Sequence, residues 1–426
     1  MECSNVLRTY ANRRNFTAEH AESVETFSFL GVLSGLGGEK WIRLRKSWGS
    51  NFRRPYGGIL RVFMLSKACI VGVYQRKLEE MVMDAPEMTL LVATPASWKD
   101  EGGVKLLERA HIRGYRLETL PLAFNGQFHL HFYPTLGRHL RDFRPDIVHI
   151  DEEPYNLATY HANRLARRCG AKTLWFSWQN LLRRYPPPFV WLERYNLRHV
   201  DYAIAGSQTA AAVWRQKGYA GPLAVIPQFG VDPEIFTPPD APRNGDAMHI
   251  AYVGRLVPEK GVDVLLRALA GLEGEWRATI LGNGPEEERL RRLAAESGLA
   301  ERVTFCSAIP STAMPAFYRT LDVLVLPSRT QPNWTEQFGR VLVEAMACGV
   351  VAVGSEAGEI PHVIGDAGPV FPENDALALH AALKRLLESP ELRRQLGARG
   401  RARVLAQFTQ QQVAQATVAV YREMLT

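Results

Sequence analysis

Cysteine is scarce in the 426-residue sequence, and its five copies are scattered. Cys3, Cys69, Cys169, Cys306 and Cys348 form no C-x-x-C pair, and no cluster of histidines lies near them. Disulfide frameworks and structural zinc sites place their cysteines at short, recurring spacings. The pattern therefore predicts reduced thiols in a cytosolic compartment rather than disulfides or zinc.

Long apolar runs are also missing, and no stretch reaches the length needed to span a bilayer. Residues 27–38 could mimic the apolar core of a signal peptide, but Glu19, Glu22 and Glu25 stand where such a peptide carries positive charge. We therefore expect a cytoplasmic protein. A hydrophobic content of 46% and a charged content of 22% are typical of a soluble globular chain, and 426 residues fit two domains.

The charge is unevenly placed along the chain. The formal net charge is +7 at pH 7, while residues 1–240 alone hold 31 Lys and Arg against 23 Asp and Glu. A basic first half favours an anionic partner, such as a phospholipid surface or a lipid-phosphate acceptor, although solubility alone would explain it. We expect weak peripheral association with an anionic inner membrane face at most, and no nucleic-acid partner.

The most informative stretch is TEQFGRVLVEAMACG, residues 335–349. Residues 322–326 before it and 350–353 after it are apolar and predict buried parallel strands. Between them, apolar residues at helical spacing predict a short helix that Gly349 ends. Glu336 then lies in the loop before the helix, and Glu344 lies two helical turns further on.

This arrangement suits a ligand that carries both hydroxyls and phosphates. Carboxylates such as Glu336 and Glu344 accept hydrogen bonds from hydroxyls, and the N–H groups of Gln337, Phe338 and Gly339 at the predicted helix start offer an anion site. An isolated pair of glutamates at this spacing would be read more simply as a cap and a surface side chain. The residues that flank the two glutamates must decide between a ligand site and this simpler interpretation.

A second motif opens the second half of the chain. A predicted strand, residues 249–253, leads into Gly254 and Arg255, and Lys260 comes just before a predicted helix that begins at Val262. Glycine allows close approach to a ligand, and two cations at a helix N-terminus suit a diphosphate. A surface turn with two solvated cations is the alternative, which the presence of Glu336 and Glu344 disfavours.

Three motifs together resemble the donor site of retaining glycosyltransferases of family 4. They are Glu-Gln-Phe-Gly at 336–339, Glu-Ala-Met-Ala-Cys-Gly at 344–349 and Gly-Glu-Ile-Pro at 358–361. The resemblance covers roughly residues 59–426 and is strongest from 250 to 370. It implies an α/β protein of the GT-B fold, with two doubly wound Rossmann-like domains facing across a cleft.

The expected organisation has four parts. Residues 1–58 show no strand–helix alternation and are expected to be a disordered extension or an overextended start. Residues 59–236 form the acceptor-binding domain, and residues 237–407 form the nucleotide-sugar domain. In the family, a terminal helix such as residues 408–426 crosses back to the first domain.

The resemblance implies transfer of a sugar from a nucleotide-diphosphate sugar, with retention and without a metal or another cofactor. The sequence accordingly has no Asp-x-Asp pair. Arg255 and Lys260 would hold the diphosphate, Glu344 the ribose, and Glu336 the sugar near its anomeric centre. The implied catalytic residues are Glu336, Arg255 and Lys260. The implied donor-binding residues are Gly72, Gly254, Arg255, Lys260, Ile309, Glu336, Gln337, Phe338, Gly339 and Glu344. Of these, Ile309 would lie near the base and Gly72 beneath the phosphates.

The first domain supplies candidates for the acceptor side, whether the acceptor is a glycan, a lipid or a small molecule. Glu152 and Glu153 follow a predicted strand, at the edge where doubly wound folds bind ligands, although solvated caps are an alternative reading. The segment Trp178, Gln179 and Asn180 stands where many family members have a histidine. The remaining candidates are His129 and His131, in an aromatic loop that has no third metal ligand and could equally be a packed turn.

Two alternatives stay open. A GT-B relative of another reaction type, such as a sugar-nucleotide epimerase or a phosphorylase, would keep the fold and the cations. A non-catalytic sugar-nucleotide-binding protein would explain the missing histidine near Trp178. The intact set of Arg255, Lys260, Glu336 and Glu344 counts against this second alternative.

Overall fold

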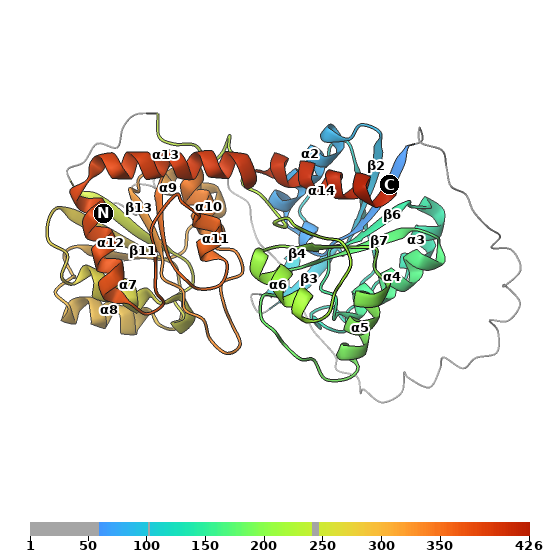
Figure 1. The fold of residues 1–426 in the computed structure, drawn as a ribbon, viewed down its shortest axis with the longest axis horizontal. Coiled ribbons are helices and arrows are strands. Elements are labelled where there is room, and N and C mark those ends of the chain that lie inside the picture. The colour runs from blue at the N-terminus through green and yellow to red at the C-terminus, as the bar shows by residue number, and fades with distance from the viewer. Residues whose placement is uncertain (1–58, 101–102, 241–246) are drawn as a thin grey trace, which may run out of the picture. The chain divides into compact units, whose positions relative to one another are not determined.

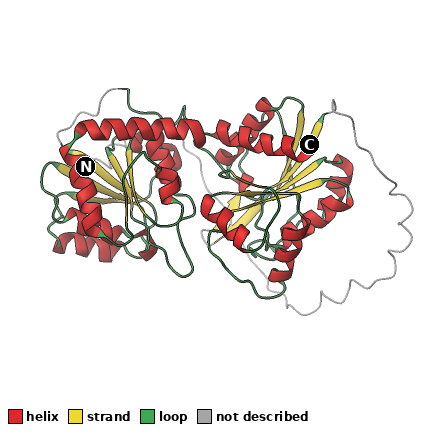
Figure 2. Cartoon of the chain, in the orientation of Figure 1, coloured by secondary structure: helices red, strands yellow, loops and turns green. Residues whose placement is uncertain are grey.

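The computed structural model describes residues 59–100, 103–240 and 247–426. The expected extension, residues 1–58, lies outside the described residues. The described chain alternates strands and helices, and it builds two parallel sheets that are each flanked by helices (Figures 1 and 2). This is the doubly wound α/β architecture that the sequence predicted.

The first sheet has seven parallel strands in the order β5-β2-β1-β6-β7-β8-β9. Its strands are β1 (Leu60–Leu65), β2 (Met88–Thr94), β5 (Arg116–Thr119), β6 (Ile147–Ile150), β7 (Lys172–Ser177), β8 (Tyr202–Ala205) and β9 (Leu223–Val225). The central strand β1 pairs with β2 and β6, placing Val62 beside Leu90 and Ile147. These side chains are buried, as expected for strands that helices cover on both faces.

Helices and short 3₁₀ turns connect these strands. They are η1 (Ala68–Ile70), η2 (Gly72–Gln75), α2 (Arg76–Asp84), α3 (Leu136–Phe143), α4 (Leu157–Arg168), α5 (Phe189–His199) and α6 (Gln208–Gln216). A small antiparallel hairpin of β3 (Ser97–Asp100) and β4 (Gly103–Leu106) stands apart from the main sheet. The sequence reading missed this hairpin because its two strands are only four residues long each and β4 is exposed.

The second sheet has six parallel strands in the order β12-β11-β10-β13-β14-β15. Its strands are β10 (Met248–Val253), β11 (Trp276–Leu281), β12 (Val303–Cys306), β13 (Val323–Leu326), β14 (Val351–Ser355) and β15 (Val370–Phe371). The connecting elements are η3 (Pro258–Lys260), α7 (Val262–Leu269), α8 (Glu287–Glu296), η4 (Ser311–Ala313), α9 (Met314–Tyr318), α10 (Arg340–Ala347), α11 (Ile360–Ile364), α12 (Ala376–Glu388) and α13 (Pro390–Gln407).

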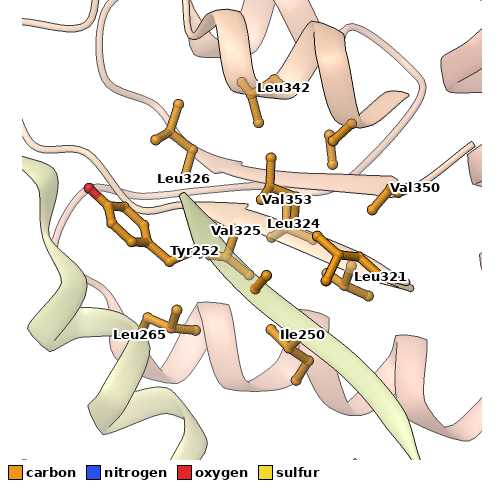
Figure 3. Packing of buried hydrophobic residues seen from close by; sticks show 14 of the residues in the cluster. Ile250, Tyr252, Leu265, Leu321, Leu324, Val325, Leu326, Leu342, Val350 and Val353 are labelled. Carbon is orange, nitrogen blue, oxygen red and sulfur yellow. The ribbon is translucent and has the colours of Figure 1, made fainter. Parts of the chain in front are cut away.

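The core of this half lies on both faces of the sheet. Leu342 of α10 covers one face of β13, and Leu265 of α7 lies on the opposite side (Figure 3). Both leucines have no exposed surface, and burying a side chain of this size contributes about 1.5–3 kcal/mol. The helices α7 and α10, which follow the loops of Lys260 and Glu336, are therefore packed firmly against the sheet.

The last helix, α14 (Gln410–Leu425), belongs to the core of the first sheet rather than the second. It packs along α2, and its Val418 and Tyr421 are buried in the same cluster as Leu78 of α2. The hydroxyl of Tyr421 is hydrogen-bonded to Nδ1 of His149 in β6, with 2.7 Å between the two atoms. Burial holds the pKa of His149 well below its usual range, so this imidazole is neutral.

Two further expectations concern cysteines and membranes. Cys69, Cys169 and Cys348 are reduced thiols, as predicted. Cys306 is not a reduced thiol, so the prediction is wrong for that residue. Within the part of the chain that the structure describes, no helix combines the length and apolarity that crossing a membrane requires.

The link between α14 and β6 gives a stability prediction. Tyr421→Phe keeps the ring but leaves Nδ1 of the buried His149 without its partner, so we expect a loss of about 1–3 kcal/mol in the free energy of unfolding. Urea denaturation of both proteins measures the difference. Tyr160→Phe is the matched control: within the described part of the chain the Tyr160 hydroxyl is hydrogen-bonded to the exposed Arg164 alone, so its loss should cost little. Equal losses in the two variants would contradict the account.

Candidate functional site

The candidate donor site lies at the carboxyl ends of β10 and β13, which are neighbours in the second sheet. The loop after β10 brings Lys260, and the loop after β13 brings Glu336, so that Lys260 Nζ and Glu336 Oε2 are 2.6 Å apart. The two side chains are only 15% and 11% exposed. Charges meeting at the carboxyl ends of parallel strands mark the usual ligand-binding edge of such a fold.

Two residues that the sequence reading did not select contact this ion pair. Ser328 Oγ donates to the same carboxylate oxygen of Glu336 at 3.0 Å, and the Lys260 ammonium lies 4.7 Å from the centre of the Trp334 ring. Both residues sit in the polar loop between β13 and α10, where no periodic pattern distinguishes them. The Glu336 carboxylate is therefore held in one orientation by a cation and a hydroxyl.

The other predicted cation, Arg255, is placed differently. Its side chain is 64% exposed, and among the described residues its guanidinium forms one ion pair, a 3.7 Å contact with Glu259. The preceding Gly254 has a φ of 154°, and a Cβ there would lie 2.7 Å from the Tyr252 hydroxyl, so only glycine fits. Lys260 is therefore the fixed cation of the site, whereas Arg255 can reorient.

Glu344 lies on α10, and its carboxylate is engaged within the protein. Oε1 accepts from Arg340 Nε at 2.8 Å, and Oε2 accepts from the Tyr318 hydroxyl at 2.9 Å. Burial raises the pKa of Glu344, and the contacts with Arg340 and Tyr318 oppose that rise. Each carboxylate oxygen can accept a second hydrogen bond, so a ribose hydroxyl can still be bound.

The predicted start of this helix was wrong. The helix begins at Arg340, after Gly339 in the left-handed conformation with a φ of 75°, so Gln337 and Phe338 lie in the loop before it. Gln337 Nε2 donates to the backbone oxygen of Trp178 at 3.2 Å, and the ring of Phe338 lies 5.5 Å from that of Trp178. A glycine inside the predicted helix start was the signal for the later boundary.

Two predicted donor residues lie outside this group. The Gly72 N–H donates to the Glu108 carboxylate at 2.7 Å, so a protein group already occupies the position that the sequence reading gave to a phosphate. Ile309 packs against the apolar core just before η4, and the N–H of the neighbouring Ala308 donates to Asn283 at 3.0 Å.

The candidate acceptor site is a cavity of about 260 Å³ in the first half of the chain. It opens at the carboxyl ends of β1, β6 and β7, and its lining includes Lys67, Glu152 and Glu153. Lys67 Nζ forms an ion pair with Glu152, and His131 Nε2 lies 3.4 Å from the other oxygen of that carboxylate. Burial alone would raise the pKa of Glu152, but Lys67 and His131 outweigh burial and lower the pKa to about 2.

The pKa of Glu153 is shifted in the opposite direction from that of Glu152. Its carboxylate accepts from Ser177 Oγ at 2.5 Å and from the N–H of Trp178 at 2.9 Å, which fixes the loop after β7. Burial nevertheless raises the pKa of Glu153 to about 7. Neither glutamate is a solvated cap, since both carboxylates are held inside the protein.

The remaining candidates separate in the structure. His131 is buried beside Glu152, whereas His129 lies among the rings of Tyr155, Tyr185 and Phe189, where burial lowers its pKa. His129 is therefore part of a packed aromatic turn. Within the described residues, no three His, Cys, Asp or Glu side chains gather in a way that could hold a metal ion.

The segment after β7 connects the two candidate sites. Asn180 Nδ2 donates to the backbone oxygen of Glu336 at 2.9 Å, and Trp178 Nε1 donates to Gln228 Oε1 at 2.9 Å. Gln179 is buried and donates to the backbone oxygen of Leu181 at 3.0 Å. Trp178 thus contacts the acceptor cavity, and Asn180 contacts the loop that carries Glu336. Gln179 stabilises the turn between them.

Comparison with known proteins agrees with this geometry. A model of glycosyl transferases group 1 matches residues 236–403, and a model of glycosyltransferase family 4 matches residues 87–235. The lipopolysaccharide core biosynthesis mannosyltransferase LpcC of Rhizobium leguminosarum bv. viciae is 30% identical over 57% of this chain and 69% of its own length. The chain belongs to the family 4 glycosyltransferases, group 1 type.

Other members of the family show how far the similarity extends. A GDP-mannose-dependent alpha-(1-6)-phosphatidylinositol monomannoside mannosyltransferase of Mycolicibacterium smegmatis is 36% identical over 42% of this chain. That alignment covers 52% of the relative, so the chain spans about half the length of such curated relatives. The structure of sucrose-phosphate synthase from Thermosynechococcus elongatus has a TM-score of 0.63 at 22% identity, covering 86% of this chain and 99% of its own, which supports the GT-B fold.

Glu153 gives a pH prediction. Because its folded pKa of about 7 exceeds the unfolded value near 4.5, the buried carboxylate destabilises the fold as pH rises from about 4.5 to 7. Glu153→Gln should remove this slope, so that the variant gains about 2–3 kcal/mol relative to the wild type between pH 5 and 8. Urea denaturation across this range measures it, with Glu118→Gln on the half-exposed strand β5 as the control. Parallel curves for wild type and Glu153→Gln would show that Glu153 is ionised throughout.

Proposed function

We propose that the chain is a retaining glycosyltransferase that moves a hexosyl group from a nucleoside-diphosphate sugar to an acceptor hydroxyl. The Lys260–Glu336 pair is the observation that carries the proposal. A cation for the phosphates and a carboxylate for the sugar meet at the binding edge of the second sheet, directly before α10. Family membership supplies independent support.

In this proposal residues 237–407 hold the donor. Its diphosphate pairs with Lys260 and with the exposed guanidinium of Arg255, while Glu344 accepts from the ribose. The departing phosphate gains negative charge as the glycosidic bond breaks, and fixed cations stabilise that charge where it develops. The carboxylate of Glu336, displaced from Lys260, then turns to the hydroxyls of the sugar.

Retention follows when the acceptor oxygen attacks from the face that the phosphate leaves. The C–O bond to the phosphate breaks, the bond to the acceptor oxygen forms, and the acceptor proton passes to the departing phosphate. This path requires neither a protein nucleophile nor a metal, and we propose that the chain uses its own cations instead.

The donor and acceptor can be narrowed further. Two similar proteins are named mannosyltransferases, and one of these names specifies GDP-mannose, so GDP-mannose is the first donor to test. Residues 59–236 would bind the acceptor in the cavity beside Glu152, with the helix of residues 408–426 completing that domain. The proposed location is the cytoplasm, with weak attachment of the basic half to anionic membranes.

Lys260 provides the first test. Lys260→Ala should weaken binding of both GDP and GDP-mannose by about 10- to 150-fold, because a charge-assisted hydrogen bond contributes about 1.5–3 kcal/mol. Calorimetry measures both affinities. Lys384→Ala is the control, since the exposed Lys384 pairs with Glu388 on α12, away from the candidate site, and its loss should leave both affinities unchanged. If UDP and its sugars bind instead, the same comparison is made with them; unchanged affinity in Lys260→Ala would refute the assignment.

Glu336 should behave differently from Lys260. Because Glu336 neutralises Lys260 before the donor binds, Glu336→Gln should leave the affinity for nucleoside diphosphate equal or slightly higher, while sugar transfer falls about 100-fold. Calorimetry and a donor-turnover assay separate the two effects, with Glu388→Gln as the control. A loss of diphosphate affinity as large as in Lys260→Ala would mean that Glu336 does not contact the sugar.

A further inference from the structure

The outer face of α4 and α5, two helices that the structure describes completely, carries arginines and no exposed carboxylate. The two helices pack side by side (Figure 1). Their exposed cations are Arg164, Arg167, Arg168, Arg194 and Arg198. Glu193 is the one acidic residue of the two helices, and it is only 7% exposed and pairs with Lys217 at 2.6 Å. The two helices therefore present positive charge alone to the solvent.

Side-chain contacts join the two helices into one surface. The ring of Tyr160 in α4 lies 4.8 Å from the ring of Tyr195 in α5. Arg167 donates to the backbone oxygen of His199 at 2.9 Å, and Arg164 donates to the Tyr160 hydroxyl at 2.9 Å. The arginines of α4 and those of α5 thus belong to a continuous cationic face.

The dipoles of the two helices do not account for all of this charge. Cations in the last turn of a helix stabilise its dipole, which explains Arg167 and Arg168 in α4 and Arg198 in α5. Arg164 and Arg194 lie before the last turn of their helices, so the dipole gives no reason for them.

Neighbouring elements do not neutralise the face either. Helix α3, which packs on α4, contributes Arg138 and Arg141 against Asp142, and Asp142 already pairs with Arg138 at 3.7 Å. Asp201, which follows α5, accepts from the N–H of Thr173 at 2.7 Å. The face keeps an excess of positive charge, which favours an anionic partner.

Trp191 adds an exposed apolar ring to this face. It lies three residues before Arg194 and seven before Arg198, a spacing that puts the three side chains on one side of α5. The Trp191 side chain is 61% exposed. Tryptophan is enriched at the interface of a bilayer, and a helix with arginines beside a tryptophan is typical of helices that lie on anionic membranes.

A bilayer fits the spread of these groups better than an acidic protein does. A folded protein would need a fixed carboxylate opposite each arginine of two helices. Lipid phosphates diffuse within a leaflet and can gather at each guanidinium, while the indole ring of Trp191 enters the headgroup layer.

We infer that the outer face of α4 and α5 is the surface by which the chain docks on an anionic phospholipid bilayer. The arginines pair with lipid phosphates, and Trp191 lies at the level of the headgroups. The inference rests on the membrane attachment in the proposed function, and it assigns that attachment to one face of the first domain.

Flotation of the full chain with lipid vesicles is the first test. The vesicles consist of phosphatidylcholine alone or of phosphatidylcholine mixed with phosphatidylglycerol. We expect the chain to float with the mixed vesicles only, and less of it to float as salt is raised, because salt screens exposed charges. Equal recovery with the two kinds of vesicle would overturn the inference.

Variants of α5 locate the attachment. Each cation near an anionic leaflet contributes about fivefold to binding, so Arg194→Glu combined with Arg198→Glu should weaken binding to the mixed vesicles about 25-fold or more. Trp191→Ser should weaken it several-fold. Unchanged binding in the double arginine variant would overturn the inference. A loss in that variant without any loss in Trp191→Ser would indicate a site for polyanions in general and would overturn the lipid assignment.

Matched controls lie on α12. Lys384→Glu combined with Arg385→Glu changes the net charge by the same amount at two exposed positions, and Leu377→Ser removes an apolar side chain that is 83% exposed. Both should bind the mixed vesicles as the wild type does. Losses as large as those of the α5 variants would show that net charge or general hydrophobicity drives attachment, which would overturn the inference.

Vesicle binding is measured without donor or acceptor, which separates this inference from the transferase proposal. If nucleoside diphosphate binds and the α5 variants float as the wild type does, the docking face is wrong and the transferase proposal stands. If the α5 variants lose flotation and no nucleoside diphosphate binds, the docking face stands and the transferase proposal fails.

Discussion

The ion pair between Lys260 and Glu336 is the constraint on which the candidate donor site depends. Both side chains are largely withdrawn from water, and removing one partner of such a pair leaves an uncompensated charge that is expensive to hold. The fold meets this requirement by bringing the loops after β10 and β13 together at one edge of the sheet. A diphosphate can replace the carboxylate at Lys260 without leaving that cation unpaired, and the same exchange frees Glu336 for the sugar.

The acceptor cavity also contains a buried ion pair. There Lys67 and Glu152 neutralise one another at the ends of β1 and β6, and His131 Nε2 lies 3.4 Å from the second carboxylate oxygen. In the proposed function the candidate donor site exchanges one anion for another at Lys260, whereas the carboxylate of Glu152 in the acceptor cavity is engaged by Lys67 and His131. Trp178 and Asn180 connect the two, since one contacts Gln228 of the cavity lining and the other the backbone of Glu336.

Apolar runs predicted the strands well, because strands buried on both faces show continuous hydrophobic sequence; β10, β13 and β14 begin within one residue of the expected positions. The helix predicted to begin at Val262 begins there. The features that the sequence did not predict depend on contacts between residues far apart in the chain. No sequence pattern links Lys260 to Glu336 across 76 residues, and nothing marks Ser328 as their neighbour. His129 and His131 look equivalent in the sequence, yet the turn between them sends one into an aromatic cluster and the other to Glu152.

The most direct test of the account is the crystal structure of the chain with a bound nucleoside diphosphate. The account predicts that Lys260 Nζ lies within hydrogen-bonding distance of a phosphate oxygen and that the Glu336 carboxylate has left its 2.6 Å contact with Lys260. A diphosphate bound elsewhere, with the Lys260–Glu336 pair unchanged, would contradict it.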